Sequence, residues 1–171
     1  MRQVIDERFA LPPTANERTL LDTFLDYQRH ALVRKCAGLT DEQLRRRAVP
    51  SSNLSLLGLV RHLATVERWY FQAVIDGNFP GSLFTRTDDR DEDFNDVDST
   101  TGEETFAIWR AEVEVSRRIA ADRPLEAVGR SFDTGREHSL RWVLTHMIDE
   151  YARHLGHADI IREAIDGQTG E

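Results

Sequence analysis

Apolar residues recur at three- and four-residue steps in four segments of this chain, and this period limits the fold more than any other feature of the sequence. Such spacing places the apolar side chains of a helix on one face, which must be buried against other helices. We therefore predict an all-α fold, a four-helix bundle with long crossover connections, formed by residues 1–171 as a single domain. The predicted helices cover about residues 17–37, 54–75, 103–121 and 139–165.

Polar caps and glycines mark the ends of these helices. Asn16 fits the start of the first helix, and Asn53 or Ser52 fits the start of the second. The residues expected to stop helices are Gly38, Gly77 and Gly167. Outside the four helices the sequence predicts a short turn that begins at Thr40, with a capping box to Gln43, and a brief extended stretch near Ser131 and Phe132.

The longest connection runs from about residue 77 to 102 and is strongly acidic over residues 87–104. Its acids and amides imitate the start of a calcium-binding EF-hand. The sixth position is Asp96 where that motif needs glycine, and the twelfth is Gly102 where it needs glutamate. We therefore expect a solvated loop, which could cover a functional site.

Charge and cysteine content exclude several classes of function. The net charge of −8 argues against nucleic acid and against an anionic membrane surface as partners. No apolar run approaches the ~18 residues that span a bilayer, and residues 1–8 lack the apolar core of a signal peptide. Cys36 is the sole cysteine, which excludes an internal disulfide. We expect a cytoplasmic protein with no nucleic-acid or membrane partner.

The candidate metal-binding residues lie in the second and fourth predicted helices. Glu150 and His154 are four residues apart, so they share one face and can reach one ion at about 2.0–2.2 Å. Both interrupt an apolar stripe, as His62 does in the second helix. A buried unpaired carboxylate is costly, and a divalent metal ion held by His62, Glu150 and His154 would neutralise it. The alternative is a hydrogen-bonded pair of Glu150 and a histidine without metal.

Two imidazoles and one carboxylate leave coordination positions open, as in catalytic zinc or non-haem iron sites. Zinc is the metal we expect first, with nickel, iron or manganese as alternatives. The sequence fixes no general base. His146 lies one turn before Glu150, and His157 lies just after His154. Either could orient a ligand or carry a proton, or could simply be a partly buried histidine held by hydrogen bonds.

Two segments resemble the DinB-like superfamily, and most closely its DUF664 branch. They are Ser55–Trp69 and Ser139–Asp159, the latter continuing to Glu171, so the resemblance covers nearly the whole chain. It implies a four-helix bundle with a divalent metal site. Many members use three histidines, and here Glu150 stands at one of those positions. The related mycothiol-dependent maleylpyruvate isomerases use a His, Glu, His set that matches His62, Glu150 and His154. Isomerase activity is not expected, because their extra C-terminal domain has no counterpart here.

The resemblance implies a metal-dependent enzyme acting on a small molecule, such as a transferase that uses a low-molecular-weight thiol of the mycothiol type as cosubstrate. The alternatives are a metal-dependent hydrolase, a metal-binding or stress-response protein without turnover, and a purely structural bundle that dimerises through an apolar helix face. A homodimer is expected from the family and from the prevalence of two-fold oligomers.

Overall fold

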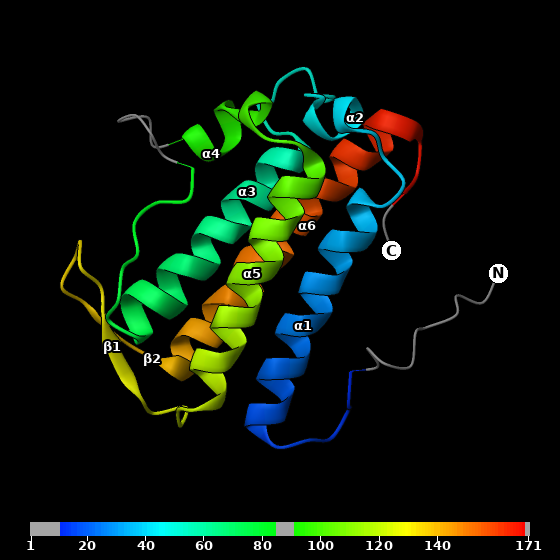
Figure 1. Cartoon of the computed structure of the whole chain (residues 1–171). Helices are drawn as coiled ribbons and strands as arrows, with labels where there is room; N and C mark the ends of the chain where they lie inside the picture. Colours follow the sequence, from blue (N-terminus) through cyan, green and yellow to red (C-terminus); the bar gives the residue numbers. More distant parts are fainter. Residues whose placement is uncertain (1–10, 85–90, 170–171) are drawn as a thin grey trace.

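The computed structural model describes residues 11–84 and 91–169 and confirms the predicted all-α fold (Figure 1). Its four long helices are α1 (Glu17–Cys36), α3 (Leu56–Glu67) with its direct continuation η2 (Arg68–Ile75), α5 (Gly102–Ala121) and α6 (Leu140–Asp166). The shorter elements are α2 (Asp41–Arg45), α4 (Glu92–Asn95), η3 (Val97–Ser99), β1 (Val128–Arg130) and β2 (Glu137–Ser139). The predictions for residues 1–8, for residues 87–90 of the acidic connection and for residues 170–171 lie outside the described residues. None of the described helices combines the length and the apolar character needed to cross a bilayer.

The directions of the helices produce one crossover. α1 and α6 run parallel, since Arg141 at the start of α6 pairs with Glu17 at 2.7 Å. At the other end of the bundle, Arg162 donates to the carbonyl oxygen of Lys35 at 2.9 Å. α3 runs antiparallel to α6 and parallel to α5 (Figure 1). The connection from η2 to α5 therefore returns along the bundle, as predicted, whereas the long connection from α1 to α3 stays at one end.

Most of the predicted helix ends are confirmed, and one is wrong. The side chain of Asn16 caps α1, and the predicted stops Gly38, Gly77 and Gly167 all have positive φ angles. α3 is capped by Ser55 rather than by Asn53 or Ser52, because the Ser55 hydroxyl accepts the N–H of Gly58 at 3.2 Å. The Ser52 hydroxyl instead accepts an N–H in the preceding turn. α3 therefore begins two residues later than the sequence predicts.

The second bundle helix changes pitch halfway along. The sequence predicts one α-helix over residues 54–75, but from Arg68 onward the chain forms the π-helix η2, with hydrogen bonds that span five residues. In an ideal α-helix Tyr70 would lie about 80° around the axis from His62. The wider turns of η2 reduce this angle and direct Tyr70 towards α6, where its ring centroid lies 4.6 Å from that of His146.

A hairpin of β1 and β2 joins α5 to α6, where the sequence predicts only an extended stretch near Ser131 and Phe132. Both of those residues lie between the strands rather than in one. The hairpin packs very closely on η2 at Gly129. A Cβ atom at this position would lie 2.0 Å from the carbonyl oxygen of Val74, so only glycine allows the contact.

Gly129→Ala is therefore expected to lower the free energy of unfolding by about 1–3 kcal/mol, because the backbone of η2 must move away from the hairpin. Gly156→Ala is the matched control. Gly156 lies within α6 with no atom within 4 Å of an added Cβ, so this change should raise stability by about 0.5–1 kcal/mol. Urea denaturation of both variants measures the two effects, and equal shifts would contradict the close packing at Gly129.

Four side chains, one from each bundle helix, form a hydrogen-bond network in the core. Arg29 of α1 donates two hydrogen bonds to the Glu67 carboxylate of α3, both at 2.8 Å. Tyr151 of α6 donates to Glu67 at 2.8 Å and accepts from the Trp109 indole N–H of α5 at 2.8 Å. All four side chains are buried. Burial, followed by the charge of Glu67, raises the pKa of Tyr151, so its hydroxyl stays protonated and can donate.

This network fixes the rotation of α6 about its own axis. A helix that turned would break the hydrogen bond of Tyr151 and leave a buried carboxylate short of a donor, which is unfavourable. Tyr151 directly follows Glu150 in the sequence, so the same constraint determines where Glu150 points. The sequence does not predict this network, because a single polar residue in each helix gives no pattern within any one helix.

From residue 91 onward, where the structure describes it, the acidic connection is not the solvated loop that the sequence predicts. Its described part forms α4 and η3, and the side chains of Glu92, Asp93 and Val97 are buried. Arg61 of α3 is fully buried and anchors the segment, donating from Nε to the backbone oxygen of Asp93 at 3.0 Å and from Nη1 to Ser99 Oγ at 3.1 Å. The connection therefore packs on α3 beside His62.

Candidate metal centre

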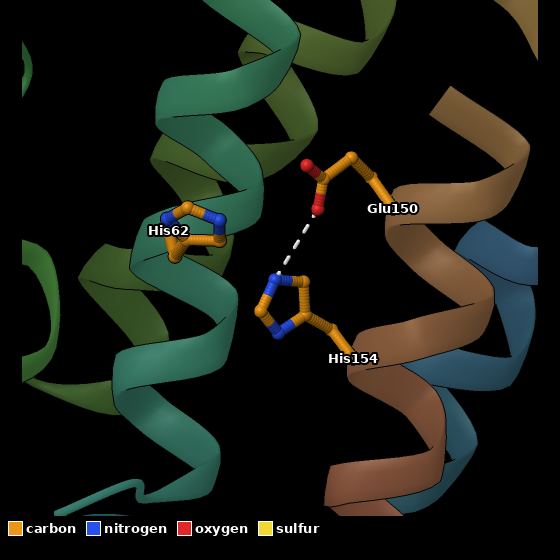
Figure 2. Close-up of side chains that lie close together, drawn as sticks. All are labelled: His62, Glu150 and His154. Atoms are coloured by element: carbon orange, nitrogen blue, oxygen red, sulfur yellow. Dashed lines mark ion pairs between the residues drawn. The ribbon is translucent and has the colours of Figure 1, made fainter. Parts of the chain in front are cut away.

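The structure brings the three predicted ligands together across the gap between α3 and α6 (Figure 2). His62 projects from α3, and Glu150 and His154 project from successive turns of α6 (Figure 2). One ligand atom of each residue lies within 4.8 Å of the others. Two atoms that bind one ion at about 2.0–2.2 Å lie at most about 4.4 Å apart, so small side-chain rotations would suffice to close the set. Two imidazole nitrogens and a carboxylate oxygen are a donor set that divalent transition metals accept.

The immediate contacts within the set are short. His154 Nε2 lies 3.3 Å from Glu150 Oε2, and the centroids of the His62 and His154 rings lie 4.7 Å apart. A ring nitrogen of His62 lies on the side of Glu150 (Figure 2). The three side chains thus converge on one point between the helices.

The ligands are less buried than the apolar stripes of the sequence suggest. The side chains of His62, Glu150 and His154 are 23%, 24% and 12% exposed. They lie at the edge of the apolar core, where residues such as Met147 and Ala158 of the same stripe are fully buried. A set at the edge of the core can be reached from solvent, which a site for a small-molecule reaction requires.

The electrostatic setting keeps His154 in the form that binds metal. Burial, followed by the proximity of His62, lowers the pKa of His154 to about 4. The imidazole is therefore neutral at pH 7, and only a neutral imidazole offers its lone pair to a cation.

A carboxylate from the acidic connection lies next to the imidazole of His62. Asp93 Oδ2 lies 3.7 Å from His62 Nδ1, and Asp93 Oδ1 accepts a hydrogen bond from Thr65 at 3.2 Å. The Phe94 ring stacks on the imidazole ring of His62, with centroids 4.7 Å apart. A carboxylate beside one ring nitrogen favours a proton there and leaves the other nitrogen available to a metal. The sequence does not predict this role of Asp93, because the position of Asp93 depends on the folding of a segment that is distant from His62 along the chain.

Asp93→Asn is expected to weaken metal binding by about 10- to 100-fold, because the amide favours a ring proton on His62 Nδ1 less than the carboxylate does. Asp98→Asn is the control, since Asp98 belongs to the same acidic segment but its side chain is 92% exposed. Competition titration against a zinc-binding dye measures both affinities. Equal affinities for the two variants would show that Asp93 does not support His62.

Of the two further histidines, only His146 contacts the ligand carboxylate. His146 Nε2 lies 3.6 Å from Glu150 Oε1, whereas the His157 ring lies 5.5 Å from that of His154. His146 is in position to orient Glu150, and His157 is in position only to pack against His154. Their roles as partners of the ligands stay predictions.

The comparisons with known proteins agree with this fold. A solved structure, described as the crystal structure of the conserved protein of locus from Enterococcus faecalis, matches with a TM-score of 0.71 and 15% sequence identity. The match covers 91% of this chain and 100% of that chain, and at this identity it concerns the fold alone. No curated protein sequence matches the chain. The model of the mycothiol-S-transferase family matches residues 20–167, which include most of α1, all of the other three bundle helices and the three candidate ligands. The chain therefore belongs to the mycothiol-S-transferase family, within the DinB-like superfamily.

Proposed function

We propose that this protein is a metal-dependent transferase that joins a low-molecular-weight thiol of the mycothiol type to an electrophilic small molecule. The observation that carries the proposal is the convergence of His62, Glu150 and His154 at the edge of the core in a chain of this family. Three protein ligands leave room for a fourth, exchangeable one. A divalent ion held by these residues would lower the pKa of a thiol bound in that position, so that the thiol reacts as a thiolate.

The chain supplies no thiol nucleophile of its own. Cys36 is its sole cysteine, and it lies near the end of α1 with only 5% of its surface exposed. Burial raises the pKa of the Cys36 thiol to about 12, so it stays protonated at neutral pH. Cys36 is therefore a small buried apolar side chain rather than a nucleophile. The reacting sulfur must therefore come from a cosubstrate.

The proposed reaction forms one sulfur–carbon bond. The S–H proton of the thiol passes to solvent or to a nearby base, and the sulfur electron pair attacks an electrophilic carbon. In a substitution, the leaving group departs with the electron pair of the bond that breaks. His146 is the described histidine nearest to Glu150 that is not itself a candidate ligand, and it could accept the proton.

Zinc, a homodimer and a cytoplasmic location complete the proposal. Zinc fits two imidazoles and a carboxylate with an open position, and nickel, iron and manganese are the alternatives. The dimer rests on the prevalence of two-fold symmetry among soluble oligomers.

The test uses protein purified without a histidine tag and loaded with zinc. The loss of free thiol is followed with a panel of low-molecular-weight thiols and electrophiles. We expect zinc-dependent consumption by the wild type and by Cys36→Ala, and a rate near background for Glu150→Ala. Equal rates for the wild type and Glu150→Ala would overturn the transferase. Bound zinc without any turnover would favour a binding protein, and zinc-dependent loss of the electrophile without loss of thiol would favour a hydrolase.

A further inference from the structure

An aromatic surface leads from the hairpin to the candidate ligands. His138, Trp142, His146 and Glu150 follow one another at four-residue steps from the end of β2 along α6. The indole of Trp142 stacks on His146, with centroids 4.8 Å apart and an interplanar angle of 14°. His138 packs against Trp142 at 4.3 Å. We call Tyr70, Trp142 and His146 the aromatic wall.

Tyr70 completes the wall from the opposite helix. Its ring meets His146 edge to face at 4.6 Å and lies 6.0 Å from Trp142. The π-helical turns of η2 produce this orientation, as described above. The wall thus spans the same two helices, α3 with η2 and α6, that carry the three ligands.

The wall is open to solvent and reaches the metal centre directly. Trp142 is 42% exposed, which is unusual for an indole in the middle of an aromatic group. At the other end of the wall, His146 Nε2 lies 3.6 Å from Glu150 Oε1. His146 therefore joins the exposed indole of Trp142 to the ligand carboxylate along one face of α6.

The charges beside the wall select the kind of molecule. Burial, followed by the charges of Glu150 and Asp133, raises the pKa of the Tyr70 hydroxyl. The hydroxyl therefore stays a neutral hydrogen-bond donor, and the Asp133 carboxylate, which is not a candidate ligand, disfavours an anion at the wall. The faces of indole and phenol rings carry negative potential, so they attract electron-poor rings. Carbon atoms that accept a thiolate are themselves electron-poor.

We propose that the aromatic wall of Tyr70, Trp142 and His146 binds the second substrate, and that this substrate is an uncharged, electron-poor aromatic or conjugated ring whose electrophilic carbon faces the metal centre. This inference rests on the proposed thiol transfer, and it adds the class of the electrophile and the residues that hold it.

A binding experiment tests the wall without any turnover. The probe is 1,3-dinitrobenzene, an electron-poor ring with no leaving group, titrated into zinc-loaded protein by equilibrium dialysis. We expect Trp142→Ala to raise its dissociation constant about tenfold and Trp142→Phe to keep most of the affinity. Trp69→Ala is the matched control, because Trp69 is a partly exposed tryptophan of η2 that contacts Phe79 instead of the wall. Equal affinity in the wild type and Trp142→Ala would overturn the wall as a binding site, whether or not the protein is an enzyme.

A kinetic experiment then separates the two proposals. With 1-chloro-2,4-dinitrobenzene, the thiol sulfur bonds to the ring carbon, chloride leaves with the electron pair of its bond, and the thiol proton passes to buffer. With iodoacetamide, iodide leaves in the same way but there is no ring. We expect Trp142→Ala to raise KM about tenfold for the aromatic compound and to change KM for iodoacetamide less than twofold. An equal rise for both compounds would overturn the specificity role. Absence of turnover with either compound in the wild type would count against the transferase alone, since the dialysis result still decides the wall.

Discussion

Glu150→Ala protein is expected to bind zinc more than about 100-fold less tightly than the wild type. Loss of a residue that only supports a ligand costs about 10- to 100-fold in affinity, and loss of a ligand itself costs more. Glu150 is also the only carboxylate of the set, so its removal leaves two neutral imidazoles to hold a doubly charged ion. Competition titration against a zinc-binding dye, with tag-free protein, measures the affinity.

Glu163→Ala provides the control for this change. Glu163 lies on an exposed position of α6, three turns and more beyond Glu150, and should leave zinc affinity unaltered. Metal removal gives a second measure: a chelator should lower the melting temperature of the wild type and of Glu163→Ala, because a metal that binds only the folded state stabilises it. The same chelator should leave Glu150→Ala unchanged. A variant at Glu150 that binds zinc as tightly as the wild type would rule out the proposed centre.

Glu67→Ala is expected to lower the free energy of unfolding by about 3–5 kcal/mol. The change removes the buried carboxylate partner of Arg29, which is 4% exposed, and with it two hydrogen bonds at 2.8 Å. Among the described residues, the guanidinium then keeps only its ion pair with the half-exposed Asp26, at 2.9 Å. The change also removes the acceptor of the Tyr151 hydroxyl. In the wild type, burial lowers the pKa of Arg29 and the Glu67 carboxylate more than offsets this effect. Without Glu67 the guanidinium still carries its charge, so the cost of burying that charge is no longer offset.

Two further variants make the result specific. Glu114→Ala removes a carboxylate that also pairs with an arginine, Arg117, but Glu114 is 59% exposed and its loss should cost less than about 1 kcal/mol. Glu67→Gln keeps the size and one acceptor oxygen, so its cost should lie between the other two. Urea denaturation followed by circular dichroism measures all three. If Glu67→Ala were no less stable than Glu114→Ala, the buried network would not hold the bundle together.

The sequence predicts the helices well because their signals are local. The apolar period, the Asn16 cap and the glycine stops act within one or two turns, and the structure confirms them. The candidate ligands could be named for a related reason. Glu150 and His154 share a helix face whatever the rest of the chain does, and His62 interrupts an apolar stripe of its own helix.

The sequence does not predict the roles of residues whose partners lie far away along the chain. Asp93 stands beside His62 only because Arg61 folds the acidic connection onto α3. Tyr70 joins the aromatic wall only because η2 widens into a π-helix, and a period of 3.6 residues gives no sign of that change. The predicted start of α3 was wrong for a local reason, because Ser52, Asn53 and Ser55 are all residues that can cap a helix and the structure uses Ser55.

The sequence by itself determined four amphipathic helices, their approximate ends and three side chains able to hold a metal ion. Only the tertiary structure decided how far these side chains are buried, which other side chains contact them and which residues form the surface beside them. Helical period and capping depend on neighbours within a few residues. The rotation of α6, fixed by Tyr151 and Glu67, depends on hydrogen bonds between residues 84 positions apart, which no local pattern encodes.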